Sequence, residues 1–178
     1  MAYGCLFCRT GKEEAVAKEV QAAHAQVRAV AASKEKHKTR HGEKTKIREV
    51  FLPGYVFFET PQDMSALDWL PKTDVIRLLQ YGDGLWKLSG EDREFARWLF
   101  RYGGLLRFSE AYKVGDRVRI TSGPLKDMEG WITKLDRRGK SAQVVLHFLN
   151  APVPVWLGFD LINARPVSPH GTVQGIQE

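Results

Sequence analysis

VGDRVRITSGPLKDMEGWI, residues 114–132, is the stretch that decides the fold of the second half of this chain. Apolar and polar residues alternate over 118–121, which is the period-two pattern of a strand with one buried face. Gly123 and Pro124 interrupt this pattern, since glycine can adopt a positive φ and proline has a fixed one. The stretch therefore predicts two strands joined by a turn, the second over 128–135.

Short apolar segments continue after this stretch and are separated by proline and by a charged turn. The predicted strands of this unit cover residues 116–121, 128–135, 142–149, 152–157 and 159–162. Five short strands suit a small barrel. The arrangement resembles the KOW motif, the opening hairpin of an SH3-like barrel found in ribosomal proteins and transcription elongation factors. Such barrels serve several functions, so the motif identifies a module only.

The first half alternates strands with helices. Thr10 is predicted as the N-cap of a helix that ends near His24, with Glu13 reaching back in a capping box. A second helix is expected to begin at Ser89 and end at the Gly103-Gly104 pair. The other predicted elements are strands at 3–9, 27–31 and 75–79, an extended stretch at 47–58 that Pro53-Gly54 interrupts, and a short helix at 64–70.

This order predicts an α+β protein: an N-terminal α/β sandwich with a mainly antiparallel sheet, followed by a five-stranded SH3-like β-barrel. We expect four segments in the chain. They are an N-terminal domain (1–102), a short linker (103–112), a barrel domain (113–164) and a flexible tail (165–178). The barrel sequence favours strands locally, so a constitutive barrel is predicted rather than a helical hairpin.

Positive charge is concentrated in one short segment. The chain has 178 residues and a formal net charge of +6, and residues 34–48 hold seven basic residues against two acidic ones, a net +5. If this segment is an extended hairpin, alternate residues form two basic rows that could follow a phosphate backbone. The alternative is a solvated loop whose charges serve solubility. The candidate RNA-binding residues here are Lys34, Lys36, Lys38, Arg40, Lys44, Lys46 and Arg48.

A second basic cluster, Arg137, Arg138 and Lys140, lies in a predicted turn of the barrel. Barrel turns of this kind contact RNA, but basic surface turns are also common without any such role. The arginines at 93, 97 and 101 recur along one side of a helix and are expected to face solvent, opposite an apolar stripe.

Catalytic and metal-binding patterns are absent from the sequence. Cys5 and Cys8 have CxxC spacing, but on a strand they would point to opposite faces, so buried reduced thiols are expected. No nucleophile elbow or phosphate-binding glycine loop occurs. We predict no enzymatic activity, no cofactor and no metal. No apolar run is long enough to span a membrane and no export signal is evident, so a cytoplasmic monomer is expected.

The segment Phe51–Phe57 combines aromatic residues with a Pro-Gly break, and a kink of this kind reorients neighbouring side chains. Followed by a KOW barrel at this distance, it resembles the NusG family of transcription elongation factors across residues 1–164. The resemblance implies that the N-terminal domain binds the clamp helices of the RNA polymerase β′ subunit through a hydrophobic depression. It would place Tyr3, Leu52, Pro53 and Tyr55 at or near that depression.

Within the family, the Thr-Gly-Lys-Glu helix opening, the Ser-Gly-Pro-Leu-Lys-Asp-Met-Glu-Gly run and the short linker look most like the LoaP subgroup. That resemblance implies processive antitermination guided by a hairpin in nascent RNA. Asp127 stands where a glycine is usual. Leu125 replaces the phenylalanine with which many housekeeping members contact ribosomal protein S10 or Rho. S10 is therefore kept only as a weak candidate partner.

The sequence leaves three alternative functions open. A housekeeping NusG would couple polymerase to the ribosome or to Rho. A ribosome-associated KOW protein would bind structured ribosomal RNA and no polymerase. An RNA-modifying enzyme is disfavoured by the missing catalytic motifs.

Overall fold

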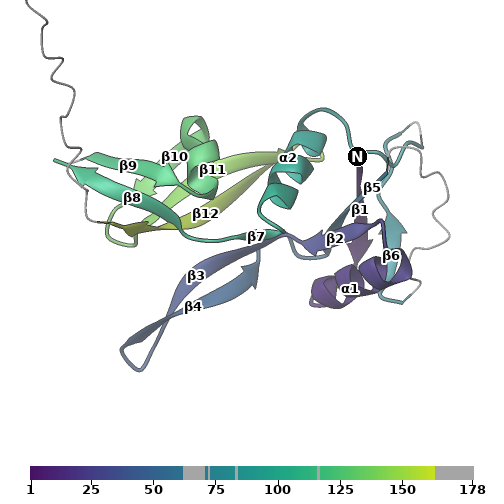
Figure 1. The fold of residues 1–178 in the computed structure, drawn as a ribbon, viewed down its shortest axis with the longest axis horizontal. Coiled ribbons are helices and arrows are strands. Elements are labelled where there is room, and N and C mark those ends of the chain that lie inside the picture. Colours follow the sequence, from purple (N-terminus) through teal and green to yellow (C-terminus); the bar gives the residue numbers. More distant parts are fainter. Residues whose placement is uncertain (62–70, 72, 83, 116, 163–178) are drawn as a thin grey trace, which may run out of the picture.

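The computed structural model describes residues 1–61, 71, 73–82, 84–115 and 117–162. The predicted helix at 64–70 and the predicted tail lie outside these residues. Two lobes lie side by side, and a two-stranded hairpin projects from the region between them (Figure 1).

The N-terminal lobe is a four-stranded antiparallel sheet with a helix on each side. The sheet order is β2 (Arg28–Ala31), β5 (Tyr55–Thr60), β1 (Ala2–Cys8) and β6 (Val75–Leu78). Helix α1 (Glu13–Ala23) packs on one face and α2 (Gly90–Arg101) contacts β1 from the other. Successive apolar residues of β5 enter both cores because alternate side chains of a strand point to opposite faces. The predicted α/β sandwich is confirmed.

Helix α1 starts later than the capping pattern predicts. Its N-cap position is Lys12, without a side-chain cap, so the prediction of Thr10 as N-cap is wrong. The Glu13 carboxylate is buried and accepts hydrogen bonds from the backbone N–H groups of Gly11 (3.1 Å) and Gly54 (2.7 Å). The Glu13 carboxylate therefore binds a tertiary partner, Gly54 of the Pro-Gly turn, and does not close the capping box that the local sequence predicts.

The C-terminal lobe is a curled five-stranded sheet of order β10-β11-β12-β8-β9, which confirms the small KOW-type fold. Its elements are β8 (Ser109–Val114), β9 (Arg117–Ser122), α3 (Pro124–Asp127), β10 (Ile132–Asp136), β11 (Ser141–Phe148) and β12 (Ala151–Leu161). Strand β8 begins inside the predicted linker, which also holds the short strand β7 (Leu105–Leu106). The domain division itself stays a prediction.

Two strand predictions in this lobe are wrong in detail. The strand predicted at 128–135 begins at Ile132, because Glu129–Trp131 form a 3-10 turn after α3. The strands predicted at 152–157 and 159–162 are the single strand β12, despite Pro152 and Pro154. These prolines pair only with β11, since β8 joins β12 over residues 159–161. Their missing N–H groups therefore disrupt no second ladder.

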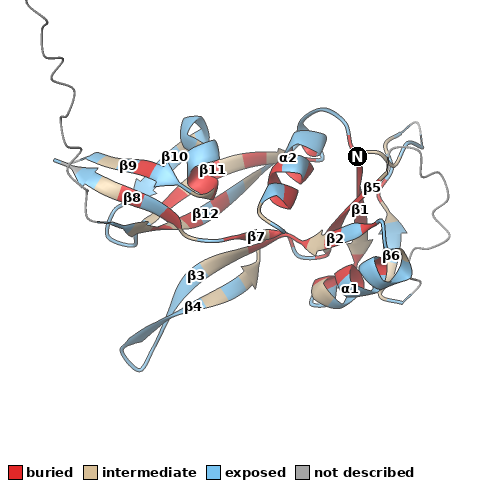
Figure 2. Cartoon of the chain, in the orientation of Figure 1, coloured by how far each residue is buried: buried red, intermediate tan, exposed pale blue. Residues whose placement is uncertain are grey.

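The basic segment forms an antiparallel hairpin of β3 (Ser33–Arg40) and β4 (Glu43–Val50), with β7 pairing in parallel beside β3. His41 and Gly42 make its turn with positive φ of 51° and 85°. Of the two alternatives for this segment, an extended hairpin and a solvated loop, the structure has the extended hairpin. Figure 2 shows that exposure increases from the base of the hairpin to its tip.

The two lobes pack against each other and share one continuous hydrophobic core. We call this packing of the lobes the docked arrangement. Phe148, at the end of β11, is 3% exposed and lies against three aromatic rings of the N-terminal domain. Ring-centroid distances are 5.5 Å to Tyr55, 5.0 Å to Phe57 and 5.7 Å to Phe95. Asp92 of α2 also accepts a hydrogen bond from the Leu149 N–H at 2.7 Å. The apolar stripe of α2 thus packs partly against the barrel.

Candidate nucleic-acid interface and protein-binding surface

The two basic rows lie on opposite faces of the hairpin. In the register of β3 and β4, Lys36 is opposite Ile47 and Lys38 is opposite Thr45, whereas Lys46 is opposite His37. Directly opposed residues share a face of an antiparallel pair. The first row therefore contains Lys34, Lys36, Lys38 and Arg40, and the second contains Lys44, Lys46 and Arg48.

Basic residues near the base of the hairpin have acidic partners. Lys34 and Lys36 both pair with Glu49, and burial lowers the pKa of the Lys34 ammonium. Lys46 pairs with Asp160 of β12 at 2.7 Å. Arg48 pairs with Glu14 of α1 at 2.6 Å. These four charges are partly neutralised within the protein.

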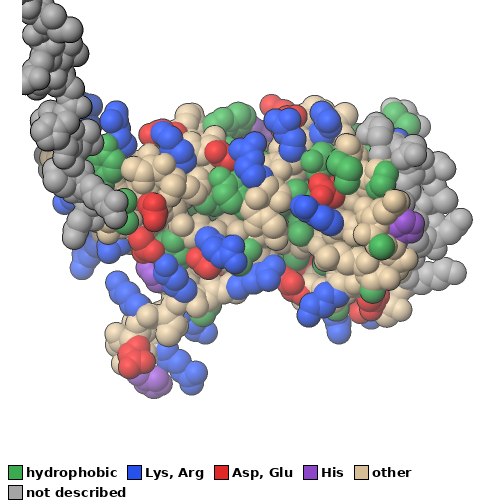
Figure 3. Space-filling model, in the orientation of Figure 1, with side chains coloured by type: hydrophobic (Ala, Val, Ile, Leu, Met, Phe, Trp, Pro, Cys, Tyr) green, Lys and Arg blue, Asp and Glu red, His purple; other side chains and the backbone are tan. Residues whose placement is uncertain are grey.

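The tip of the hairpin is different. Lys38, Arg40 and Lys44 are exposed, and none of them forms an ion pair with any residue in the described ranges. In Figure 3 blue side chains lie along this projecting element, with red and purple side chains near its end. We call Lys38, Arg40 and Lys44 the tip cations. They are the hairpin charges most available to a phosphate.

Phe108 anchors the base of the hairpin to the barrel. Its ring lies 4.5 Å from the His37 ring and 4.5 Å from the Lys46 Nζ, measured between ring centroids and from Nζ to centroid. Its backbone N–H donates to Glu35 at 3.2 Å. Nothing local in the sequence links Phe108 or Asp160 to the basic segment, so sequence patterns predict neither residue as part of this site.

The second basic cluster lies near this anchor. Arg137, Arg138 and Lys140 are exposed in the turn between β10 and β11. The Lys140 carbonyl accepts a hydrogen bond from the Phe159 N–H at 2.9 Å, and the next residue, Asp160, pairs with Lys46. The turn and the hairpin base therefore meet at the same end of β12. Among the described residues, no ion pair joins the cluster to the tip cations.

The apolar residues assigned to polymerase binding are mostly covered. Tyr3 is 9% exposed, Leu52 is 7% exposed and Tyr55 is half-buried beneath Phe148. Pro53 is exposed at the adjoining turn. In the docked arrangement the barrel thus occupies part of the surface that the family resemblance assigns to polymerase.

A polar clasp joins the lobes beside this apolar contact. The Asp127 carboxylate pairs with the Arg101 guanidinium at 2.6 Å and accepts a hydrogen bond from the Tyr102 hydroxyl at 2.8 Å. This clasp depends on the Asp127 carboxylate, which forms both contacts. Burial, followed by the hydrogen bond to Asp127, raises the pKa of Tyr102 from 10.0 to about 12.

This clasp predicts an alkaline opening of the lobes. A Tyr102 freed from the barrel loses its proton near its ordinary pKa of 10.0, whereas docked Tyr102 keeps it until about 12. Ionisation therefore favours the open form, and docking should weaken as pH rises through this window. Carbon-13 NMR titration of labelled tyrosine measures the pKa. Asp127→Asn should lower it, and an unchanged value would show that the hydrogen bond has no such effect.

The two cysteines lie on opposite faces of β1, as predicted, with Cys5 in the core shared with α2 and Cys8 in the core under α1. Both are free and buried, and burial raises the pKa of Cys5 well above its ordinary value and that of Cys8 to about 11. Within the described ranges, no group of three His, Cys, Asp or Glu side chains is placed to hold a metal ion. No helix in those ranges has the length and apolarity needed to cross a bilayer.

Comparison with known families assigns both lobes. Residues 1–96 match the family model described as transcription termination factor nusG, and residues 114–147 match the KOW motif. The first match alone covers more than half of the chain. The chain belongs to the NusG family. NusG proteins are transcription factors without enzymatic activity.

Known relatives agree with this assignment. The chain is 24% identical over 130 residues to the transcription termination/antitermination protein NusG of Treponema pallidum (strain Nichols), covering 66% of this chain and 69% of that protein. A solved structure described as "Domain interaction in Thermotoga maritima NusG" is similar in fold, with a TM-score of 0.51 and 22% identity. The alignment covers 88% of this NusG-family chain and 93% of the other.

Proposed function

We propose that this NusG-family chain is a processive antitermination factor of the LoaP type, which binds RNA polymerase and a hairpin in nascent RNA. Membership of the NusG family supplies the broader role in transcription termination and antitermination. The projecting hairpin with its unpaired tip cations carries the finer proposal.

The hairpin suits a folded RNA. Its basic rows lie on opposite faces, so a ribbon inserted between two phosphate strands could contact both of them. The second cluster in the β10–β11 turn can extend this contact from the hairpin base. Charge contacts of this kind position a protein on RNA, while unpaired loop bases supply sequence preference.

Polymerase binding is assigned to the N-terminal domain through Tyr3, Leu52, Pro53 and Tyr55. Apolar residues gathered on one surface commonly form the centre of a protein interface. Phe148 covers Tyr55, so polymerase would have to displace the barrel. RNA and polymerase together would bind more tightly than either alone, because each contact raises the effective concentration of the other.

Ribosomal protein S10 is a weaker candidate partner. Leu125 occupies the position of the phenylalanine that contacts S10 or Rho in housekeeping members, and it is 0% exposed here. A buried aliphatic residue offers little to a partner. A stable pull-down of S10 or Rho by the full chain at physiological salt would favour the housekeeping alternative.

Removing the tip cations tests the RNA proposal. In the variant Lys38→Ala/Arg40→Ala/Lys44→Ala, we expect affinity for a leader hairpin RNA to fall about tenfold or more and the slope of log K against log salt to flatten by about 2. Mobility-shift assays across a salt series measure both quantities.

A charge-matched control removes three cations that already have acidic partners: Lys36→Ala/Lys46→Ala/Arg48→Ala. It should reduce affinity less than the tip variant. Equal losses in the two variants would assign binding to total charge rather than to the tip, and unchanged binding in the tip variant would refute the proposal.

A further inference from the structure

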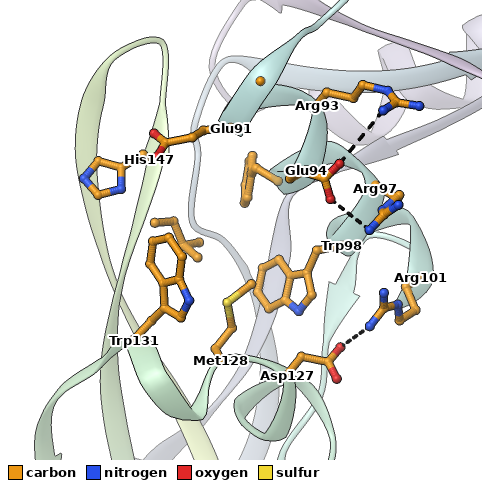
Figure 4. Close-up of a pocket in the computed structure, with 13 residues that line it drawn as sticks. Glu91, Arg93, Glu94, Arg97, Trp98, Arg101, Asp127, Met128, Trp131 and His147 are labelled. Carbon is orange, nitrogen blue, oxygen red and sulfur yellow. Dashed lines mark hydrogen bonds and ion pairs between the residues drawn. The ribbon is translucent and has the colours of Figure 1, made fainter.

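A pocket lies in the seam between α2 and the barrel, apart from the basic hairpin (Figure 4). Its volume is about 680 Å³. The α2 side contributes Gly90, Glu91, Arg93, Glu94, Phe95, Arg97, Trp98 and Arg101, and the barrel side contributes Asp127, Met128, Trp131, Leu146 and His147. Binding pockets often form at such domain interfaces.

Aromatic side chains line both sides of this pocket. Trp131 and His147 lie on the barrel side with ring centroids 6.2 Å apart, and Trp98 lies on the helix side (Figure 4). Trp131 is 49% exposed, although a large ring of this kind is usually covered in a folded protein. An exposed ring at the edge of a pocket provides a stacking surface for a flat ligand.

Two polar atoms of the lining lack partners. Trp98 is 5% exposed, and its Nε1 has no hydrogen-bond acceptor in the described structure. The Nδ1 of His147 is also buried without a partner there. A buried polar group without a hydrogen bond costs about 1–3 kcal/mol, so such groups call for an explanation. Both atoms are closed to solvent while the pocket is empty, so a ligand in the pocket reaches them only after the lining side chains move.

The charges of the lining nearly balance. Three arginines face three carboxylates, with Arg97 paired to Glu94 at 2.9 Å and Arg101 paired to Asp127 at 2.6 Å. This balance does not favour a strongly anionic ligand such as a triphosphate. It suits a flat, uncharged ring that carries at most one phosphate directed to the exposed arginines at the rim.

We propose that this pocket binds a single unstacked nucleobase. The base would stack on the half-exposed ring of Trp131, with its phosphate near the arginines of α2. A free mononucleotide and an unpaired nucleotide of RNA share this chemistry. Because the walls come from both domains, the occupant would bind the docked arrangement preferentially and stabilise it.

Isothermal titration of the full chain with AMP, GMP, CMP and UMP tests this site. We expect saturable binding of at least one nucleotide, weakened roughly tenfold in Trp131→Ala because a base loses its stacking partner. Trp156→Ala is the matched control, since Trp156 is a 38% exposed barrel tryptophan outside the lining. Its affinity should be unchanged. Short single-stranded RNA binding more tightly than the mononucleotide would identify RNA as the source.

Several outcomes would overturn the proposal. They are no saturable binding of any of the four nucleotides at millimolar concentration, equal loss in the two tryptophan variants, or tighter binding of N-acetyltryptophanamide, which would assign the pocket to an aromatic side chain of a protein partner. The tip variant should keep its mononucleotide affinity. Failure of the hairpin proposal and failure of this one are therefore distinguishable.

Discussion

Phe148→Ala should release the barrel from the N-terminal domain. The substitution removes ring contacts with Tyr55, Phe57 and Phe95, and truncation of a buried phenylalanine costs about 3–5 kcal/mol. These contacts all cross the seam, so the loss falls mainly on docking. Small-angle scattering should show a larger radius of gyration, and the linker should become more sensitive to protease.

The same variant tests the proposed role of the covered surface. Releasing the barrel uncovers Tyr55, so affinity for core RNA polymerase should rise, while mononucleotide binding in the seam should fall. NMR should show that the barrel keeps its β-sheet spectrum, which checks that it remains folded. Trp156→Ala is the control, since this exposed barrel residue makes no such contact. A compact Phe148→Ala protein with unchanged polymerase affinity would contradict this account.

Gly54→Ala should have the second largest effect, on the stability of the N-terminal domain. Gly54 has φ +85°, and an added Cβ would lie 2.8 Å from Phe7 Cε2 and 3.3 Å from the Cys8 carbonyl oxygen. Backbone strain and overpacking together should lower the free energy of unfolding by about 2–4 kcal/mol. Urea titration measures this change.

Gly42→Ala separates the effect of backbone strain from that of overpacking. Gly42 also has φ +85°, but nothing lies within 4 Å of its added Cβ. It carries the backbone strain alone, and its loss should be about 1 kcal/mol. Equal losses at the two positions would show that packing against Phe7 contributes nothing. The difference between the variants measures how tightly the Pro53-Gly54 turn is held beside β1.

Strands and helices with strong local patterns were predictable. The alternation at 118–121, the apolar stripe of α2 and the Pro-Gly break before β5 each depend on neighbours in sequence, and the structure has the corresponding elements. The start of α1 was not predictable in the same way. The Glu13 carboxylate binds Gly54, which lies 41 positions away in the chain.

In the candidate site, too, some features follow from the local sequence and others depend on the fold. The sequence located the basic segment and offered an extended hairpin as one alternative, but the register placed its rows on opposite faces and left three cations unpaired at the tip. Nothing in the local sequence distinguishes Lys46 from the other lysines, because its ion pair with Asp160 forms only in the folded chain. Pairing decides which charges remain available, and pairing depends on distant segments.

By itself, the sequence determined the kind of protein: two modules, a concentrated positive segment and an aromatic kinked strand, because these features follow from composition and from periodicity over a few residues. Only the tertiary structure decided how the modules meet. It placed Phe148 on Tyr55, tied Asp127 to Arg101 and Tyr102, and formed the seam pocket. The physical reason is that each of these contacts joins residues distant in the chain, whose packing and charge pairing exist only after both lobes have folded.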